Sequence, residues 1–167
     1  MIVRAADARD ASAMVGLLNA LLATTTIEWT ETPHTEATLT NWIDDHETVL
    51  VAEDHGEIIG LGAFGWFRDA EVRPGYRFTV EHTVHVRQDQ WGTGVGRTLM
   101  SALIEGARRS GKHTMVAAID GSNERSIAFH QRLGFVEVGR MSEVGTKFGQ
   151  WLDLVILQLR LDDRTIP

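Results

Sequence analysis

The chain has 167 residues, a net charge of −7 and no cysteine. This length suits one compact domain spanning residues 1–167, with room for a proper hydrophobic core. The acidic balance argues against a nucleic-acid partner, which needs clustered Lys and Arg, although a local basic patch could still bind a phosphorylated cofactor. The lack of cysteine excludes disulfides, thiolate metal sites and a cysteine-borne acyl intermediate.

No apolar run approaches the roughly 20 residues that a membrane-spanning helix needs. The N-terminal residues 1–7 also lack the basic start and apolar stretch of an export signal. We therefore expect a cytoplasmic protein with no membrane partner.

The first half of the chain opens with a short strand at residues 2–5. Apolar residues at helical spacing then predict a helix from about Asp10, ended by the β-branched run at residues 24–26. A second helix is expected from about Thr35. A hairpin follows, and its turn at His55-Gly56 joins strands at residues 49–53 and 58–66.

The second half begins with a charged loop at residues 68–75. Residues 76–86 alternate apolar and polar side chains, which predicts a strand with two distinct faces. Asn123 is expected to cap a helix that Gly134 ends. The remaining patterns predict a helix at residues 94–110 and strands at residues 114–119, 136–141 and 151–161. The order predicts an α+β fold, mostly antiparallel, with one strand-helix-strand unit in the middle.

Three alternating glycines, Gly92, Gly94 and Gly96, join a strand to a helix. Such a turn lets backbone amides point into a concavity at a helix N-terminus, which carries about half a positive charge and suits a pyrophosphate. The spacing differs from the Rossmann G-x-G-x-x-G, and no P-loop Lys-Ser/Thr follows. The loop therefore predicts a different phosphorylated cofactor, although the glycines alone fit a plain tight turn equally well.

The order strand, Gln-x-x-x-Gly-x-Gly, helix, strand and then residues 123–135 resembles the GCN5-related N-acetyltransferase (GNAT) superfamily. The segments 75–84, 116–119, 130–135 and 144–154 further resemble its phosphinothricin and methionine sulfoximine N-acetyltransferase branch. The likeness covers nearly the whole chain. It implies a GNAT-type sheet flanked by helices, acetyl-CoA as co-substrate, no metal, a small amino acid or analogue as substrate, and a homodimer.

The resemblance also implies a set of cofactor-binding residues. The backbone of Val84, His85 and Val86 is expected to hold the pantetheine arm, and Asn123 to touch the pantetheine or the thioester region. Arg132 is expected near the cofactor phosphates. The pyrophosphate is expected on Gly92, Thr93, Gly94, Val95, Gly96 and Arg97. Trp91 departs from the superfamily, which usually has Gln or Arg there, so we expect weaker side-chain support rather than loss of binding.

Two residues are candidates for acid-base chemistry. A protonated amine must lose a proton before it attacks a thioester, and Glu81 in the predicted strand is placed to accept it. The alternative is a solvated glutamate or an ion pair with Arg77. His130 stands where many superfamily members have a tyrosine, so it is the candidate acid for the departing thiolate, unless it is a packing residue.

The substrate end is expected at a loop that offers an aromatic wall and cationic forks, namely Arg73, Gly75, Tyr76 and Arg77. An arginine can hold a carboxylate or phosphinate in bidentate fashion, although Arg73 also fits an ordinary solvated residue. Thr26 and Trp29 are further candidates for the pocket wall. The other histidines show no metal-ligand spacing such as H-E-x-x-H and are predicted to be surface or packing residues: His34, His46, His55, His82 and His113.

The sequence therefore predicts direct acetyl transfer from acetyl-CoA to a small primary amine in a ternary complex. Two alternatives stay open. One is acetylation of peptide or protein N-termini, which needs an open groove. The other is an acyl-CoA-binding sensor without turnover, an alternative suggested by the unusual Trp91 in the glycine loop.

Overall fold

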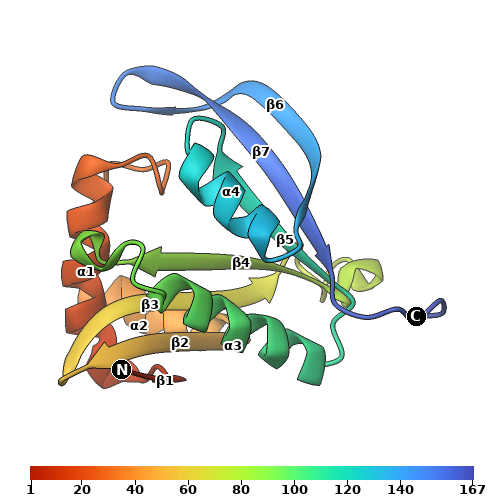
Figure 1. Cartoon of the computed structure of the whole chain (residues 1–167), viewed down its shortest axis with the longest axis horizontal. Coiled ribbons are helices and arrows are strands. Elements are labelled where there is room, and N and C mark those ends of the chain that lie inside the picture. The colour runs from red at the N-terminus through yellow and green to blue at the C-terminus, as the bar shows by residue number, and fades with distance from the viewer.

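The computed structural model describes residues 1–167, which form one seven-stranded sheet with helices on both faces (Figure 1). The strands are β1 (Ile2–Ala5), β2 (Thr48–Asp54), β3 (Glu57–Trp66), β4 (Thr79–Val86), β5 (Thr114–Asp120), β6 (Val136–Lys147) and β7 (Gln150–Arg160). The helices are α1 (Ala11–Thr24), α2 (Glu36–Asp45), α3 (Val95–Arg109) and α4 (Glu124–Arg132). No helix combines the length and the apolar character that crossing a membrane requires.

The strand order is β1-β2-β3-β4-β5-β7-β6. All neighbouring strands are antiparallel except β4 and β5, which are parallel and connected through α3. The structure thus confirms the predicted α+β class with a single strand-helix-strand unit. That one parallel pair lies in the middle of the sheet, where it positions the site described below.

Local signals in the sequence explain where the helices begin and end. Thr35 caps α2 by accepting a hydrogen bond from the Thr38 amide, and Asn123 caps α4 in the same way through Ser126. Gly134 follows α4 with a positive φ of 94°, a conformation that glycine adopts without strain. These observations confirm the predicted start of α2 and the predicted caps of α4 at Asn123 and Gly134.

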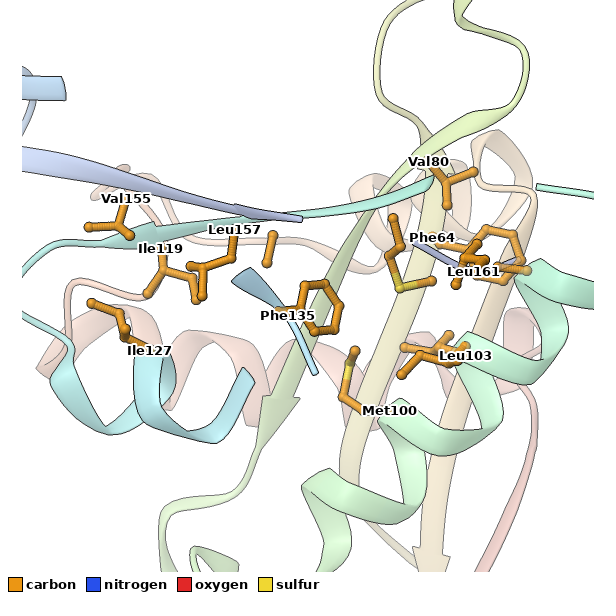
Figure 2. Close-up of a cluster of buried hydrophobic side chains, with 14 residues drawn as sticks. Phe64, Val80, Met100, Leu103, Ile119, Ile127, Phe135, Val155, Leu157 and Leu161 are labelled. Atoms are coloured by element: carbon orange, nitrogen blue, oxygen red, sulfur yellow. The ribbon is translucent and has the colours of Figure 1, made fainter. Parts of the chain in front are cut away.

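The core lies in two layers, one on each face of the sheet. Figure 2 shows the larger cluster, in which Phe64 and Val80 of the sheet pack with α3 residues such as Leu103. Leu61 of β3 points to the opposite face and joins a second cluster with α1 and α2. Because successive side chains of a strand alternate, β3 and β4 present distinct surfaces to the two helical layers.

Two predicted boundaries were wrong. The strand expected at 76–86 begins only at Thr79, because Pro74–Tyr76 form a 3-10 turn in which the Arg77 amide donates to the Pro74 carbonyl. The strand expected at 136–141 continues to Lys147 as β6. Its pairing with β7 shifts register between Met141 and Gly145, and this bulge hides the period-two pattern in the sequence.

Candidate active site

The two edges of β4 are paired to very different extents. On one side, β4 pairs with β3 from Val80 to Val86. On the other side, it pairs with β5 only from Thr79 to Glu81. Beyond Glu81 the two strands diverge, as Figure 1 shows, and a cleft of about 740 Å³ lies between them. The fold therefore builds this concave site along an unpaired strand edge.

The register shows which main-chain groups of β4 face the cleft. The Arg87 amide donates to Ile59 of β3 at 3.0 Å. Because an antiparallel strand turns alternate residues toward each neighbour, Thr83 and His85 also bond β3, whereas Val84 and Val86 face away from it. The Val86 carbonyl accordingly accepts the Trp91 indole N–H at 2.7 Å. Of the three residues expected to bind pantetheine, His85 thus has its backbone committed to the sheet.

The glycine loop ends in unpartnered amides at the start of α3. Gly92 and Gly94 have φ values of 86° and 102°, a region in which a side chain is strained. Several amides of the loop and the first turn donate to nothing in the protein: those of Gly92, Gly94, Val95, Gly96 and Arg97. With the positive end of the helix dipole, they form an anion site. Thr93, which was also expected to bind the pyrophosphate, has no free amide, because its N–H donates to the Gln90 carbonyl.

Basic side chains border the glycine loop. The Arg125 guanidinium lies 4.9 Å from the centre of the Trp91 ring, and both residues line the cleft together with Arg97, Arg132 and the cap residue Asn123. Arg125 was missed from the sequence. The available signal was its spacing of seven residues from Arg132, which places both on one side of α4.

Two histidines line the cleft on the α4 side. The His82 and His130 rings stack with centroids 5.1 Å apart, and burial lowers the pKa of both groups, that of His82 to about 3. His130 Nδ1 donates to the Ser126 carbonyl at 2.7 Å, so its Nε2 is a bare acceptor with no partner. His130 is therefore a neutral ring at neutral pH, which opposes the predicted acid role unless the ring first takes up a proton.

Glu81 lies at the point where β4 and β5 separate. It pairs with Gly65, so it faces the α1–α2 side together with Thr83 and His85. Its carboxylate is half-buried and has no hydrogen bond or ion pair in the protein, and this burial raises the pKa of Glu81. The alternative ion pair with Arg77 is absent, because that guanidinium bonds the Pro74 carbonyl and stacks on Phe78.

Residues 25–34, which we call the cleft loop, cover this face of the site. Thr26 donates to the Asp120 carboxylate, and Lys147 Nζ donates to the Glu28 carbonyl at 2.8 Å. The Trp29 indole lies against Gly145 of β6, where a Cβ atom would overlap it. Thr26 lines the cleft as predicted, whereas Trp29 fastens the loop to β6 instead.

The predicted substrate loop is separate from the cleft in this structure. Arg73, Gly75, Tyr76 and Arg77 are exposed, and none of them lines the cleft. They precede β4 and therefore lie at its paired end, on the far side of Glu81 from the glycine loop. Arg68 lies over the Tyr76 ring at 5.9 Å.

A split parallel pair, an anion site at a helix N-terminus and a half-buried carboxylate where the pair separates define an acyl-CoA-dependent amine acyltransferase. The model of the acetyltransferase (GNAT) family matches residues 14–135, and the chain belongs to this family. The fold, the enzyme class and acetyl-CoA as co-substrate, which the sequence predicted, are thereby confirmed.

Similar proteins carry more specific names. The chain is 45% identical over 165 residues to an L-methionine sulfoximine/L-methionine sulfone acetyltransferase of Pseudomonas aeruginosa, covering 96% of this chain and 94% of that protein. It is 41% identical to the L-amino acid N-acyltransferase MnaT of Escherichia coli, covering 100% and 98%. The structure of YncA from Salmonella typhimurium with acetyl-CoA superposes with a TM-score of 0.92 at 39% identity, covering 99% and 96%.

Proposed function

We propose that this enzyme acetylates the primary amine of a small amino acid or analogue of the methionine sulfoximine, methionine sulfone or phosphinothricin type. The relatives' names support this substrate class. The observation that carries the proposal is Glu81, an unpartnered and half-buried carboxylate at the last paired position of β4 and β5, directly before the cleft-lining residues His82 and Thr83.

The residues present fit acetyl-CoA. The unpartnered amides of Gly92 and of Gly94 to Arg97 match the pyrophosphate, with Arg125 and Arg132 adding positive charge. The open edge of β4 at Val84 and Val86 offers main-chain groups to the amides of the pantetheine arm. When bound, acetyl-CoA supplies the thioester carbonyl that the amine attacks directly, with coenzyme A as the leaving group.

Glu81 prepares the nucleophile. An ammonium ion has no free electron pair, so its N–H bond must break and the proton must move to an acceptor, directly or through water. Burial raises the pKa of Glu81 toward neutrality, which makes this carboxylate a stronger base than an exposed glutamate. A thiol with a pKa near 8.5 leaves readily, so an acid is the less demanding role, and His130 stays a candidate for it.

The substrate's acidic group is assigned to the loop at Arg73, Gly75, Tyr76 and Arg77. Arg73 is exposed and carries no ion pair, so its fork is free to hold a carboxylate or phosphinate, whereas the Arg77 guanidinium already donates to the Pro74 carbonyl. The loop directly precedes β4, the strand that carries Glu81.

The reaction is tested with purified protein, acetyl-CoA, a thiol-detecting dye and a panel of amines. We expect thiol release with L-methionine sulfoximine, L-methionine sulfone or phosphinothricin well above background hydrolysis. A peptide panel run in parallel tests the N-terminal acetyltransferase alternative. Faster turnover of peptides would overturn the small-molecule assignment, and tight acetyl-CoA binding without turnover would favour the sensor.

We further propose a homodimer formed through β6 and β7. Their outward faces carry several large apolar side chains, among which Trp151 is 67% exposed: Val136, Val138, Met141, Val144 and Trp151. A second copy is the occupant that the resemblance implies. Sedimentation should give a dimer that Trp151→Glu converts to a monomer, whereas a monomeric wild type would contradict this assignment.

A further inference from the structure

His85 belongs to a polar cluster that the reaction described above does not use. Its side chain is buried on the α1–α2 face of β4, beneath the cleft loop. His85 Nε2 lies 3.0 Å from Thr83 Oγ1 and 3.4 Å from Glu28 Oε1. The other oxygen of Glu28 contacts His34 Nε2 at 2.7 Å. One carboxylate of the cleft loop thus bridges two histidines.

This arrangement leaves one ring nitrogen of His85 open. Nε2 lies between the Thr83 hydroxyl, which can donate or accept, and the Glu28 carboxylate, which can only accept, and the carboxylate favours the tautomer with the proton on Nε2. Nδ1 is then a bare acceptor, and it is buried without any partner in the protein. Buried acceptors are rarely left unmatched, and His85 lines the cleft. Both observations indicate a ligand that donates a hydrogen bond at this point.

The position of His85 relative to Glu81 suggests which donor that is. The two residues lie on the same strand face with Thr83 between them. Along the strand, each Cα atom is roughly 6.6 Å from that of Thr83, so Glu81 and His85 are about 13 Å apart at their Cα atoms. A primary ammonium ion carries three N–H donors. We propose that His85, oriented by Glu28 and His34, is a second proton acceptor for the substrate amine, acting beside Glu81. This inference rests on the proposed function.

The surrounding charges suit such a role. Burial lowers the pKa of His85, so the ring is neutral and able to accept at neutral pH, while the Glu28 charge favours the imidazolium once it forms. His34, on the far side of Glu28, disfavours the charged form of His85. Lys147 at the end of β6 and Glu31 of the cleft loop are further charged groups near Glu28. The cluster is no metal site, because no three such side chains are placed to share an ion.

The proton transfer balances without a further reactant. An N–H bond of the ammonium ion breaks, its electron pair stays on nitrogen, and the proton moves to His85 Nδ1. Glu28 compensates the new charge. His34, partly exposed at the outer end of the cluster, connects the cluster to solvent.

Kinetics with L-methionine sulfone test this role through four variants. Glu81→Gln should keep about one hundredth of the wild-type kcat, and the double variant Glu81→Gln/His85→Gln should lower this remaining rate at least about tenfold further. Glu28→Gln keeps the shape of the cluster but removes its charge, so we expect about tenfold lower kcat. His113→Gln is the matched control, since it breaks a similar histidine-carboxylate pair, with Asp162 at 2.6 Å, outside the cleft.

A readout independent of turnover is the titration of His85 in histidine-labelled protein, assigned by its absence in His85→Gln. Glu28→Gln should lower the pKa of His85, because the favourable charge is gone, and L-methionine sulfone should shift the His85 signal but not that of His113. An unmoved His85 signal, or a residual Glu81→Gln rate unaffected by His85→Gln, overturns the inference. The proposed function fails separately, if the wild type binds acetyl-CoA but acetylates no small amine.

Discussion

The two edges of β4 show how one strand serves both stability and chemistry. Toward β3 it makes a continuous antiparallel ladder from Val80 to Val86, whereas toward β5 it pairs only from Thr79 to Glu81. The same backbone is saturated on one side and open on the other. The site thus arises from hydrogen bonds that the fold leaves unmade, and Glu81, the carboxylate that we propose as the base, lies at the last paired position.

Removing the carboxylate at that position should have the largest effect. Glu81→Gln keeps the size of the side chain but cannot take a proton, so we expect kcat to fall about 100-fold while acetyl-CoA affinity stays unchanged. In the wild type, kcat/KM should fall as the pH drops through the pKa of Glu81, because the protonated group accepts nothing. Since burial raises this pKa, the decline should begin above the range of an exposed glutamate.

Steady-state rates across pH measure kcat and kcat/KM, and calorimetry with coenzyme A measures the affinity for the cofactor. A kcat within twofold of the wild type in Glu81→Gln would show that the end of the paired segment is structural only.

The next effect concerns the loop that covers the open edge. A methyl group on Gly145 overlaps the Trp29 indole, so Gly145→Ala should displace the cleft loop and cost about 2 kcal/mol of stability. The KM for the amine should rise with it. Gly139→Ala in the same strand is the control, because its Cβ meets nothing within 4 Å. Equal melting temperatures of the two variants would contradict the fastening role of Trp29.

A smaller effect is expected at the cofactor end. Arg125→Ala removes a cation beside the glycine loop, so acetyl-CoA affinity should fall about tenfold, and the difference should shrink at high salt. Arg109→Ala, at an exposed position near the end of α3, is the control for a lost surface charge. Calorimetry at two ionic strengths checks this, and a loss independent of salt would point to packing on Trp91 instead.

The smallest effect needs no substitution. Without cofactor, the amides of Val84 and Val86 should exchange hydrogen severalfold faster than those of Thr83 and His85, because only the latter pair bonds β3. Coenzyme A should slow the first pair selectively. Equal protection of all four amides in the free protein would contradict the assignment of the open edge.

Much of the fold could be predicted from the sequence because its signals are local. Helical and strand periodicities placed the elements, and Thr35, Asn123 and Gly134 ended or began helices where short-range geometry requires. The glycine loop and Glu81 could be singled out as candidates for the same reason, because each is recognised from its own short segment, and their roles stay predictions. The bulge near Glu143, with φ of 54°, broke the pattern and hid half of β6.

The parts that were missed depend on contacts between distant segments. Lys147 contacts Glu28, although the two residues are 119 positions apart in the sequence. No periodicity in the sequence predicts that the loop at residues 25–34 covers β4. Which amides of β4 are open depends on register, a property of pairing rather than of composition. The role of the loop at Arg73 stays a prediction.

The indole of Trp91, held under a guanidinium and bonded to the open strand edge, gives the protein a built-in optical reporter. Among the five tryptophans, Trp91 is the one that lines the cleft beside the glycine loop. A cofactor bound at that loop should change the polarity around the Trp91 ring. The tryptophan emission of the protein should therefore respond to cofactor loading, without a label and before any amine is added.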